Sequence, residues 1–178
     1  MRLEEDGLQV AAVLAPVFRD GAGMLRTVLV VRADHGRHGN QLGFPGGKPE
    51  PGDDGLLSTA LREAEEEVGL ASRTVEILAA LPPLDTRQTG FRVYGFVGRI
   101  PSGTTWRLDT HEIVGILTPT IAELAAPEAR STLPFASSHY PEGFMVEGID
   151  VDGHVLWGMT LRLLDGLVPR LLAGEWAV

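Results

Sequence analysis

The sequence predicts an α/β fold in which a mixed β-sheet is covered by helices on both faces. Apolar and β-branched segments recur between glycine-rich turns, two longer segments have the apolar periodicity of helices, and the two kinds of segment are interleaved. The chain has 178 residues, of which 44% are hydrophobic. That length suits one domain with a substantial core better than two, so we expect residues 1–178 to form a single domain.

The first half of the chain predicts strands followed by a loop and a helix. Apolar runs bounded by glycine and charged residues predict strands at 8–18 and 27–32, flanking a turn at 21–23. A glycine-punctuated loop covers residues 32–49. Helical periodicity then extends from Leu56 to Val68, and Gly69 follows where helices commonly end.

The second half predicts further strands and a final helix. We expect strands at 75–81, 91–100 and 113–117, and a short helix after Pro119. Residues 156–172 have helical periodicity, and the expected apolar face consists of Trp157, Leu161, Leu164 and Val168. Residues 130–155 are ambiguous, and short strands and turns are the expectation there.

Composition excludes several functional classes. A net charge of −9 disfavours binding to nucleic acid or to a membrane surface, both of which depend on basic residues. No apolar run has the length of a membrane span, and the acidic residues 1–6 lack the features of a signal peptide. We therefore expect a soluble, cytoplasmic protein. The absence of cysteine excludes disulfides and thiol catalysis, and the five histidines have no zinc-binding spacing.

Three glutamates converge on one face of the predicted 56–68 helix. Glu63, Glu66 and Glu67 adjoin an apolar stripe, while Glu65 points elsewhere; the stripe comprises Leu57, Ala60, Leu61, Ala64 and Val68. Like charges at these spacings repel, and Arg62 reaches Glu66 but cannot neutralise all three. A hard cation such as Mg²⁺ or Mn²⁺ would stabilise the cluster. A solvated acidic helix face is the alternative interpretation.

The segment around these glutamates resembles the Nudix box, G-x5-E-x7-R-E-U-x-E-E-x-G-U, in which U is a bulky apolar residue. Residues 62–70 fit its second half, with Ala64 in the apolar position. In the first half, Asp54 stands where the box has Glu, and Gly47 lies one residue too far upstream. We interpret this as a one-residue insertion with a Glu-to-Asp change. The resemblance implies that Asp54 pairs with Arg62; alternatively, Asp53 or Asp54 is the helix N-cap.

The resemblance implies a Nudix-type α/β/α sandwich with a mixed central sheet, and metal-dependent hydrolysis of a phosphoanhydride bond. The implied catalytic residues are Arg62, Glu63, Glu66 and Glu67. The implied ligands of Mg²⁺ or Mn²⁺ are the same three glutamates, the backbone carbonyl of Gly47, and Glu112 as a second-tier ligand. Glu112 is equally well interpreted as a single carboxylate at a strand edge. Which glutamate accepts the proton of water is left open.

The loop before the helix is similar to the signature of the Nudix coenzyme A pyrophosphatases. The residues that carry the similarity are Arg32-Ala33, Arg37, His38-Gly39-Asn40-Gln41 and the run Phe44-Pro45-Gly46-Gly47. Asn40 replaces a family glycine, and the spacing from Arg37 to Phe44 is one residue shorter. The similarity implies cleavage of coenzyme A, or a derivative, to 4′-phosphopantetheine and adenosine 3′,5′-bisphosphate.

The residues expected at the substrate are Arg32, Arg37, Phe44, Gly46 and Gly47. Arginines are the expected complement of the several phosphates of coenzyme A, although basic residues in a solvated turn are the alternative. Two other functions stay open: a Nudix pyrophosphatase acting on ADP-ribose or a dinucleotide, and a non-catalytic Nudix-fold nucleotide sensor. The repelling glutamates disfavour a sensor. A homodimer is common for the fold.

Overall fold

The computed structural model describes residues 4–35, 39–86 and 90–178, so the predicted Arg37 lies outside the described residues. The central sheet is built on two long strands, β2 (Leu8–Arg19) and β9 (Phe91–Arg99), which pair in parallel from Gln9 opposite Phe91 to Val17 opposite Arg99. Antiparallel strands extend this sheet: β1 (Glu4–Glu5), β3 (Leu25–Thr27) and β6 (Gly46–Gly47) pair with β2, and β7 (Glu76–Ala80) and β8 (Leu84–Thr86) pair with β9. The sheet is therefore mixed, as predicted.

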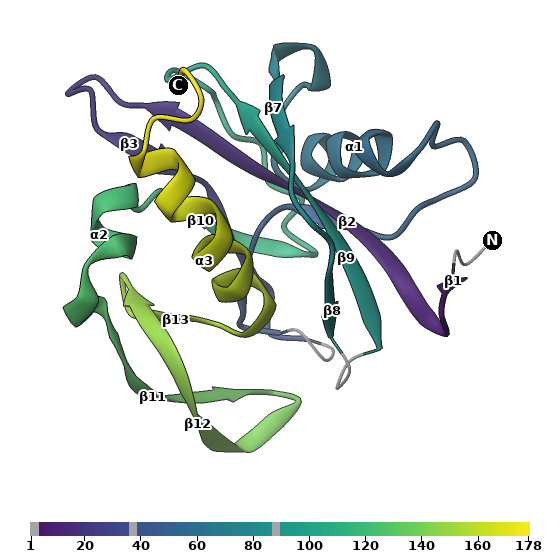
Figure 1. The fold of residues 1–178 in the computed structure, drawn as a ribbon. Helices are drawn as coiled ribbons and strands as arrows, with labels where there is room; N and C mark the ends of the chain where they lie inside the picture. The colour runs from purple at the N-terminus through teal and green to yellow at the C-terminus, as the bar shows by residue number, and fades with distance from the viewer. Residues whose placement is uncertain (1–3, 36–38, 87–89) are drawn as a thin grey trace.

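Two smaller antiparallel sheets adjoin the central one. The first contains, in spatial order, β10 (Ile113–Leu117), β4 (Leu29–Arg32) and β5 (Leu42–Gly43). The second contains β11 (Arg130–Ser137), β12 (Tyr140–Val151) and β13 (His154–Trp157). In Figure 1 the second sheet forms a lobe below the final helix, apart from the central sheet.

Helices cover both faces of the central sheet. The long helices α1 (Leu56–Val68) and α3 (Gly158–Leu172) lie on opposite sides of β2 and β9, and shorter turns complete the fold: α2 (Ile121–Ala125), η1 (Ser72–Thr74) and η2 (Pro127–Ala129). The alternation of β2 explains this arrangement, because its successive side chains point to opposite faces. Leu14 belongs to the core cluster that includes Ala64 of α1, whereas Val17 belongs to the cluster that includes Leu167 of α3. The predicted α/β/α sandwich is confirmed.

Most predicted elements are found close to their expected bounds. The helix from Leu56 to Val68 is confirmed, and it ends as predicted because Gly69 adopts φ 72° and donates its N–H to Glu65 at 3.0 Å. The expected strand at 27–32 is instead divided between β3 and β4, which belong to different sheets. None of the helices in the described ranges is both long and apolar enough to cross a membrane.

The region from 130 to 157 differs most from expectation. In place of short strands and turns, β11 and β12 form a long hairpin, and β13 adds to it. The prediction of a helix starting at Leu156 is wrong at its first turn, because Leu156 and Trp157 pair with β12. Gly158 then adopts φ 64°, and the helix begins there. Pairing across the sheet overrides the helical periodicity of these residues.

Candidate active site

The glutamates of α1 differ greatly in burial. Glu67 is only 3% exposed and lies on the same side of the helix as the buried Ala60 and Ala64, whereas Glu66 is exposed. The predicted apolar stripe is rotated accordingly, since Leu57 and Leu61 are only partly buried. Glu67 therefore occupies a position that the sequence pattern alone would assign to an apolar residue.

Two donors hold the buried Glu67 carboxylate. Arg32 Nη1 donates to Oε1 at 3.1 Å, and the backbone N–H of Gly46 donates to Oε2 at 3.0 Å. Burial raises the pKa of Glu67 to about 7, and the nearby charges of Glu63 and Glu112 add to that shift, whereas Arg32 and the Gly46 N–H oppose it. These contacts bring the helix and the FPGG loop together at one carboxylate.

Glu63 lies directly against the glycine-rich loop. A Cβ added to Gly47 would lie 2.4 Å from Glu63 Oε1, so the absence of a side chain at Gly47 allows this approach. Burial raises the pKa of Glu63, while Arg62 lowers it. The Glu63 carboxylate of the helix and the backbone of the loop at Gly47 therefore lie side by side.

Arg62 is the organising side chain of this region, and its partner is Asp53. Arg62 Nε donates to Asp53 Oδ1 at 3.0 Å, and its terminal nitrogens reach Glu66 at 2.8 Å and Glu63 at 3.1 Å. It also donates to the carbonyl of Lys48 at 3.0 Å. The hydrogen bond from Arg62 lowers the pKa of Asp53 to about 2.

The predicted pairing of Asp54 with Arg62 is therefore wrong. Asp54 is exposed, whereas the Asp53 carboxylate also accepts hydrogen bonds from Thr59 Oγ1 at 2.8 Å and from the Glu50 N–H at 2.9 Å. The alternative that either residue caps the helix is also wrong, because Gly55 occupies the N-cap position. Asp53 stands six residues after Gly47, as the box requires, so the insertion lies between Asp53 and Arg62.

The remaining acidic residues separate into near and distant groups. Glu112 is exposed, and its charge adds a small part to the raised pKa values of Glu63 and Glu67, so it belongs to the near group. Glu65 points away, as predicted, and accepts hydrogen bonds from the backbone and hydroxyl of Ser72 at 3.1 and 2.7 Å.

The described residues expected at the substrate have roles within the protein as well. Arg32 bridges Glu67 and the carbonyl of Gly46, to which Nη2 donates at 3.2 Å. Phe44 is 2% exposed and belongs to the core cluster on the α3 side. Gly46 and Gly47 form β6, which pairs with Val13 and Ala12 of β2.

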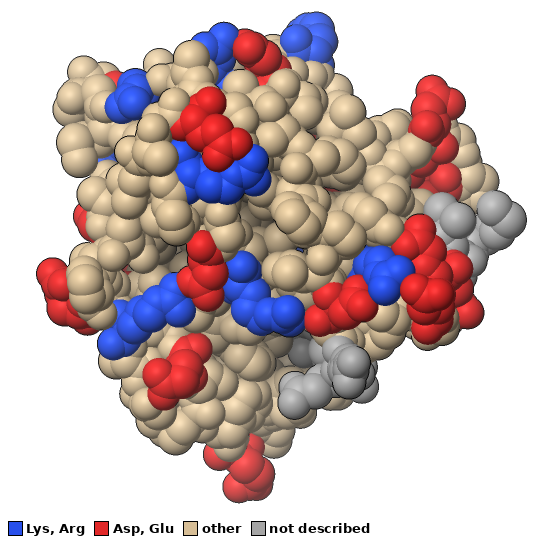
Figure 2. All heavy atoms as spheres, viewed as in Figure 1, with Lys and Arg blue, Asp and Glu red and all other residues tan. Residues whose placement is uncertain are grey.

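A groove of about 1290 Å³ opens beside these residues. One part of it is lined by the FPGG loop together with the cations of Arg32 and Lys48. Another part is lined by aromatic residues of the second small sheet, and the start of α3 connects the two. On the face seen in Figure 2, basic and acidic side chains alternate across the middle of the molecule.

Comparison with known proteins identifies the family. The family model described as the NUDIX domain matches residues 8–136, which include the loop, α1 and the strands around them. The chain belongs to the Nudix family. NudL of Yersinia pestis, an uncharacterized Nudix hydrolase, is 34% identical over 169 residues, covering 90% of this chain and 79% of NudL. The chain is accordingly a Nudix hydrolase, as predicted.

Solved Nudix structures have the same fold. An Ap4A hydrolase of C. elegans in a binary complex aligns with a TM-score of 0.60 at 16% identity, covering 93% of this chain and 98% of that one. The NUDIX domain of Shewanella oneidensis NrtR, complexed with ADP ribose, aligns with a TM-score of 0.62 at 15% identity, covering 94% and 90%. At these identities the likeness establishes the fold.

Nudix hydrolases generally need divalent metal ions, and the donors at this site fit a hard cation in their chemistry. All candidate ligands are oxygens, and burial penalises the charged forms of Glu63 and Glu67, so a nearby cation would offset that penalty. Within 4–35, 39–86 and 90–178, no three acidic or imidazole side chains are yet clustered as a metal site. Arg32 and Arg62 hold oxygens of all three glutamates instead.

Several residues of the Nudix site were not predicted from the sequence. Asp53 could have been found, since the spacing from Gly47 identifies it once the insertion is placed after it. The groove residues of the second small sheet could not, because their segment was interpreted as short strands and turns. Lys48 stands directly after the FPGG run, and its position alone was an available signal.

Proposed function

We propose that this Nudix hydrolase cleaves the phosphoanhydride bond of coenzyme A or a derivative, giving 4′-phosphopantetheine and adenosine 3′,5′-bisphosphate. The observation that carries the hydrolytic part is the contact of Glu63 and Glu67 with the Gly46–Gly47 loop at the cationic part of a groove. The loop signature before the box supports coenzyme A as the substrate.

In the proposed reaction, the oxygen of water attacks one phosphorus of the diphosphate and the bridging P–O bond breaks. The electron pair of that bond leaves with the other phosphate, and the proton of water passes to a base. A bound Mg²⁺ or Mn²⁺ would acidify the water and screen phosphate charge. Glu63, Glu66 and Glu67 would hold the ion, and Arg62 would keep Glu63 and Glu66 in position through the contacts described above.

The substrate is tested by incubating purified protein with coenzyme A and Mn²⁺. Both products are expected, and chelation with EDTA should abolish their formation. Dephospho-coenzyme A and ADP-ribose, assayed in parallel, measure how much the 3′-phosphate and the pantetheine arm contribute. Intact coenzyme A after prolonged incubation would refute the substrate assignment, and turnover of ADP-ribose alone would identify the substrate instead.

Glu67→Gln tests the metal site. The change keeps the size of the side chain but removes an anionic ligand, so turnover should fall by roughly 10³-fold or more, in line with losses seen for central catalytic groups. Glu65→Gln on the same helix is the matched control, since Glu65 bonds Ser72 away from the loop, and it should keep wild-type turnover. Wild-type activity in Glu67→Gln would falsify the assignment.

One observation favours a second substrate class. Arg32 is engaged with Glu67 and Gly46, which leaves it less available to bind a 3′-phosphate. ADP-ribose and dinucleotides lack that phosphate, so they are the second candidates. For the non-catalytic sensor, tight nucleotide binding without metal-dependent turnover would be the decisive result. A homodimer stays a prediction that light scattering can test.

A further inference from the structure

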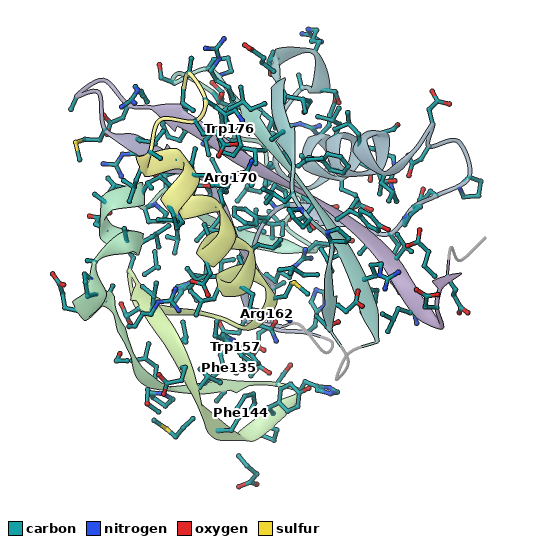
Figure 3. The ribbon with its side chains drawn as sticks, viewed as in Figure 1. Phe135, Phe144, Trp157, Arg162, Arg170 and Trp176 are labelled. Carbon is teal, nitrogen blue, oxygen red and sulfur yellow. The ribbon has the colours of Figure 1, made fainter. Side chains whose placement is uncertain are left out.

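The groove has an aromatic wall that the hydrolytic residues do not account for. Tyr140, Phe144 and Trp157 line it, and Phe135 is packed behind them with its ring centroid 5.0 Å from that of Trp157. Phe144 meets both Tyr140 and Trp157 edge to face, with centroids 5.4 Å apart in each pair. These residues come from β11, β12 and β13, and Figure 3 shows Phe135, Phe144 and Trp157 gathered below the start of α3.

The burial of these rings is uneven. Phe135 is only 3% exposed, which is ordinary for a core residue, but Phe144 is 38% exposed. Tyr140 and Trp157 are intermediate. A cluster built only for stability would bury its largest rings, because each buried aromatic side chain contributes substantial apolar area. The wall therefore combines a buried inner ring, Phe135, with an accessible ring surface that faces the groove.

The aromatic wall is continuous with the cationic part of the groove. A Cβ on Gly43 would lie 3.6 Å from Arg32 Nε and 3.9 Å from Thr160 Oγ1, so both side chains approach Gly43, and all three residues line the same groove. Thr160 Oγ1 donates to the carbonyl of Leu42 at 3.2 Å, which fixes the start of α3 on β5. Trp157 lies three residues before Thr160, at the end of β13. A single small molecule can therefore contact both parts of the groove.

We propose that this wall, with Phe144 at its centre, binds the flat base of a nucleotide substrate by stacking while the diphosphate lies at the FPGG loop. The inference rests on the proposed hydrolysis of a nucleoside diphosphate derivative and adds the residues that recognise its base. Every base has a π-face, and stacking on an aromatic side chain is worth about 1–3 kcal/mol per base.

One polar feature at the wall agrees with a base. Arg162 lies beside Trp157 in Figure 3 and lines the groove, where a guanidinium can stack on a base or donate to its edge. An aliphatic arm such as pantetheine would use the apolar area but gain nothing from the flat ring faces.

The test uses binding instead of turnover. The affinity of α,β-methylene-ADP, which resists cleavage at the diphosphate, is measured by calorimetry with Mg²⁺ present. Replacing Phe144 by Ala or Leu should weaken binding by roughly 5- to 100-fold, because neither side chain has a ring face, although Leu keeps apolar volume. Phe144→Trp should keep the affinity, because Trp retains a ring face. Met145→Ala is the matched control: Met145 is 60% exposed, adjacent on β12, and absent from the groove lining, so its loss should leave affinity unchanged.

Several results would overturn the assignment. They are undetectable binding of the analogue to the wild type, equal affinity in wild type and Phe144→Ala, and an effect of Phe144→Leu no larger than that of Met145→Ala. If Phe144→Ala weakened the binding of 4′-phosphopantetheine but left the binding of the analogue unchanged, the wall would be assigned to the other arm of the substrate. Because the analogue is not hydrolysed, a failure of coenzyme A cleavage leaves the stacking result standing, and intact cleavage with unchanged affinity refutes stacking alone.

Discussion

Glu67 is a charged residue in a position that the helix otherwise uses for packing. Its carboxylate is held by Arg32 and the Gly46 N–H, yet burial dominates and raises its pKa to about 7. A group so penalised in its ionised form destabilises the metal-free protein, and such costs are commonly found where a protein is arranged for function.

The cost of Glu67 should be visible as a pH dependence of stability. In the unfolded chain its pKa is near the ordinary 4.5, so the folded state binds the extra proton between about pH 4.5 and 7. The stability of wild type relative to Glu67→Gln should therefore fall as pH rises from about 5 to 8, by about 3 kcal/mol in total. Urea unfolding in EDTA measures this difference. A difference that stays constant with pH would show that Glu67 is not buried as described.

The Asp53 and Asp54 pair offers a second test on neighbouring carboxylates. The lowered pKa of Asp53 means that its interaction with Arg62 stabilises the fold above about pH 4, and that this contribution is lost as pH falls through about 2. At about pH 7, Asp53→Asn should cost about 2 kcal/mol of unfolding free energy. Asp54→Asn, the matched control, should change it by less than about 0.5 kcal/mol because Asp54 is exposed. If Asp54→Asn lowered the unfolding free energy more than Asp53→Asn, Asp54 would be the partner of Arg62, as first predicted.

At the scale of elements, the site depends on how closely β6 approaches α1. Gly46 adopts φ 155° and has Ala12 and Val13 of β2 at its α-carbon, so a side chain there would meet backbone. Gly47 differs, because the three atoms nearest to a Cβ added there all belong to the flexible end of Glu63. Substitution at Gly47 should consequently move a carboxylate while leaving the fold intact.

Gly47→Ala should lower kcat by about tenfold or more, equivalent to about 1.4 kcal/mol of transition-state stabilisation, while the melting temperature changes by only about 2 °C. The expected cause is displacement of Glu63 from the loop. Gly103→Ala is the control, since no atom lies within 4 Å of a Cβ added there. Steady-state kinetics and thermal melting measure the two quantities. Unchanged kcat with lowered stability would place the role of Gly47 in folding.

The elements also show which parts of the fold the sequence specifies locally. The α1 helix was predicted at both ends because apolar periodicity and the left-handed Gly69 act within the segment itself. Trp157 was assigned to a helix because its spacing from Leu161 is helical, but hydrogen bonding to β12 decides its conformation. Such pairing joins residues that are distant in sequence, so no local pattern could reveal it.

At the scale of the molecule, the same distinction applies to the site. The Nudix hydrolase assignment followed from the sequence, because the residues of the box lie close together along the chain. The bridge from Arg32 to Glu67 spans 35 positions and required the folded chain. The groove required more still, because its aromatic wall comes from a hairpin whose register only the structure gives.

That hairpin extends past residue 136, where the match to the family model ends, whereas the glutamates and the FPGG loop lie well inside it. The rings that we propose for base binding, Tyr140, Phe144 and Trp157, therefore lie outside the stretch that holds the proposed cleavage residues. On that proposal, substitutions at these rings would alter which nucleotide is accepted without changing the residues that break the bond. Relatives of this chain could differ in substrate preference while keeping the same hydrolytic residues. Comparison of their hairpin sequences is where such differences should be sought.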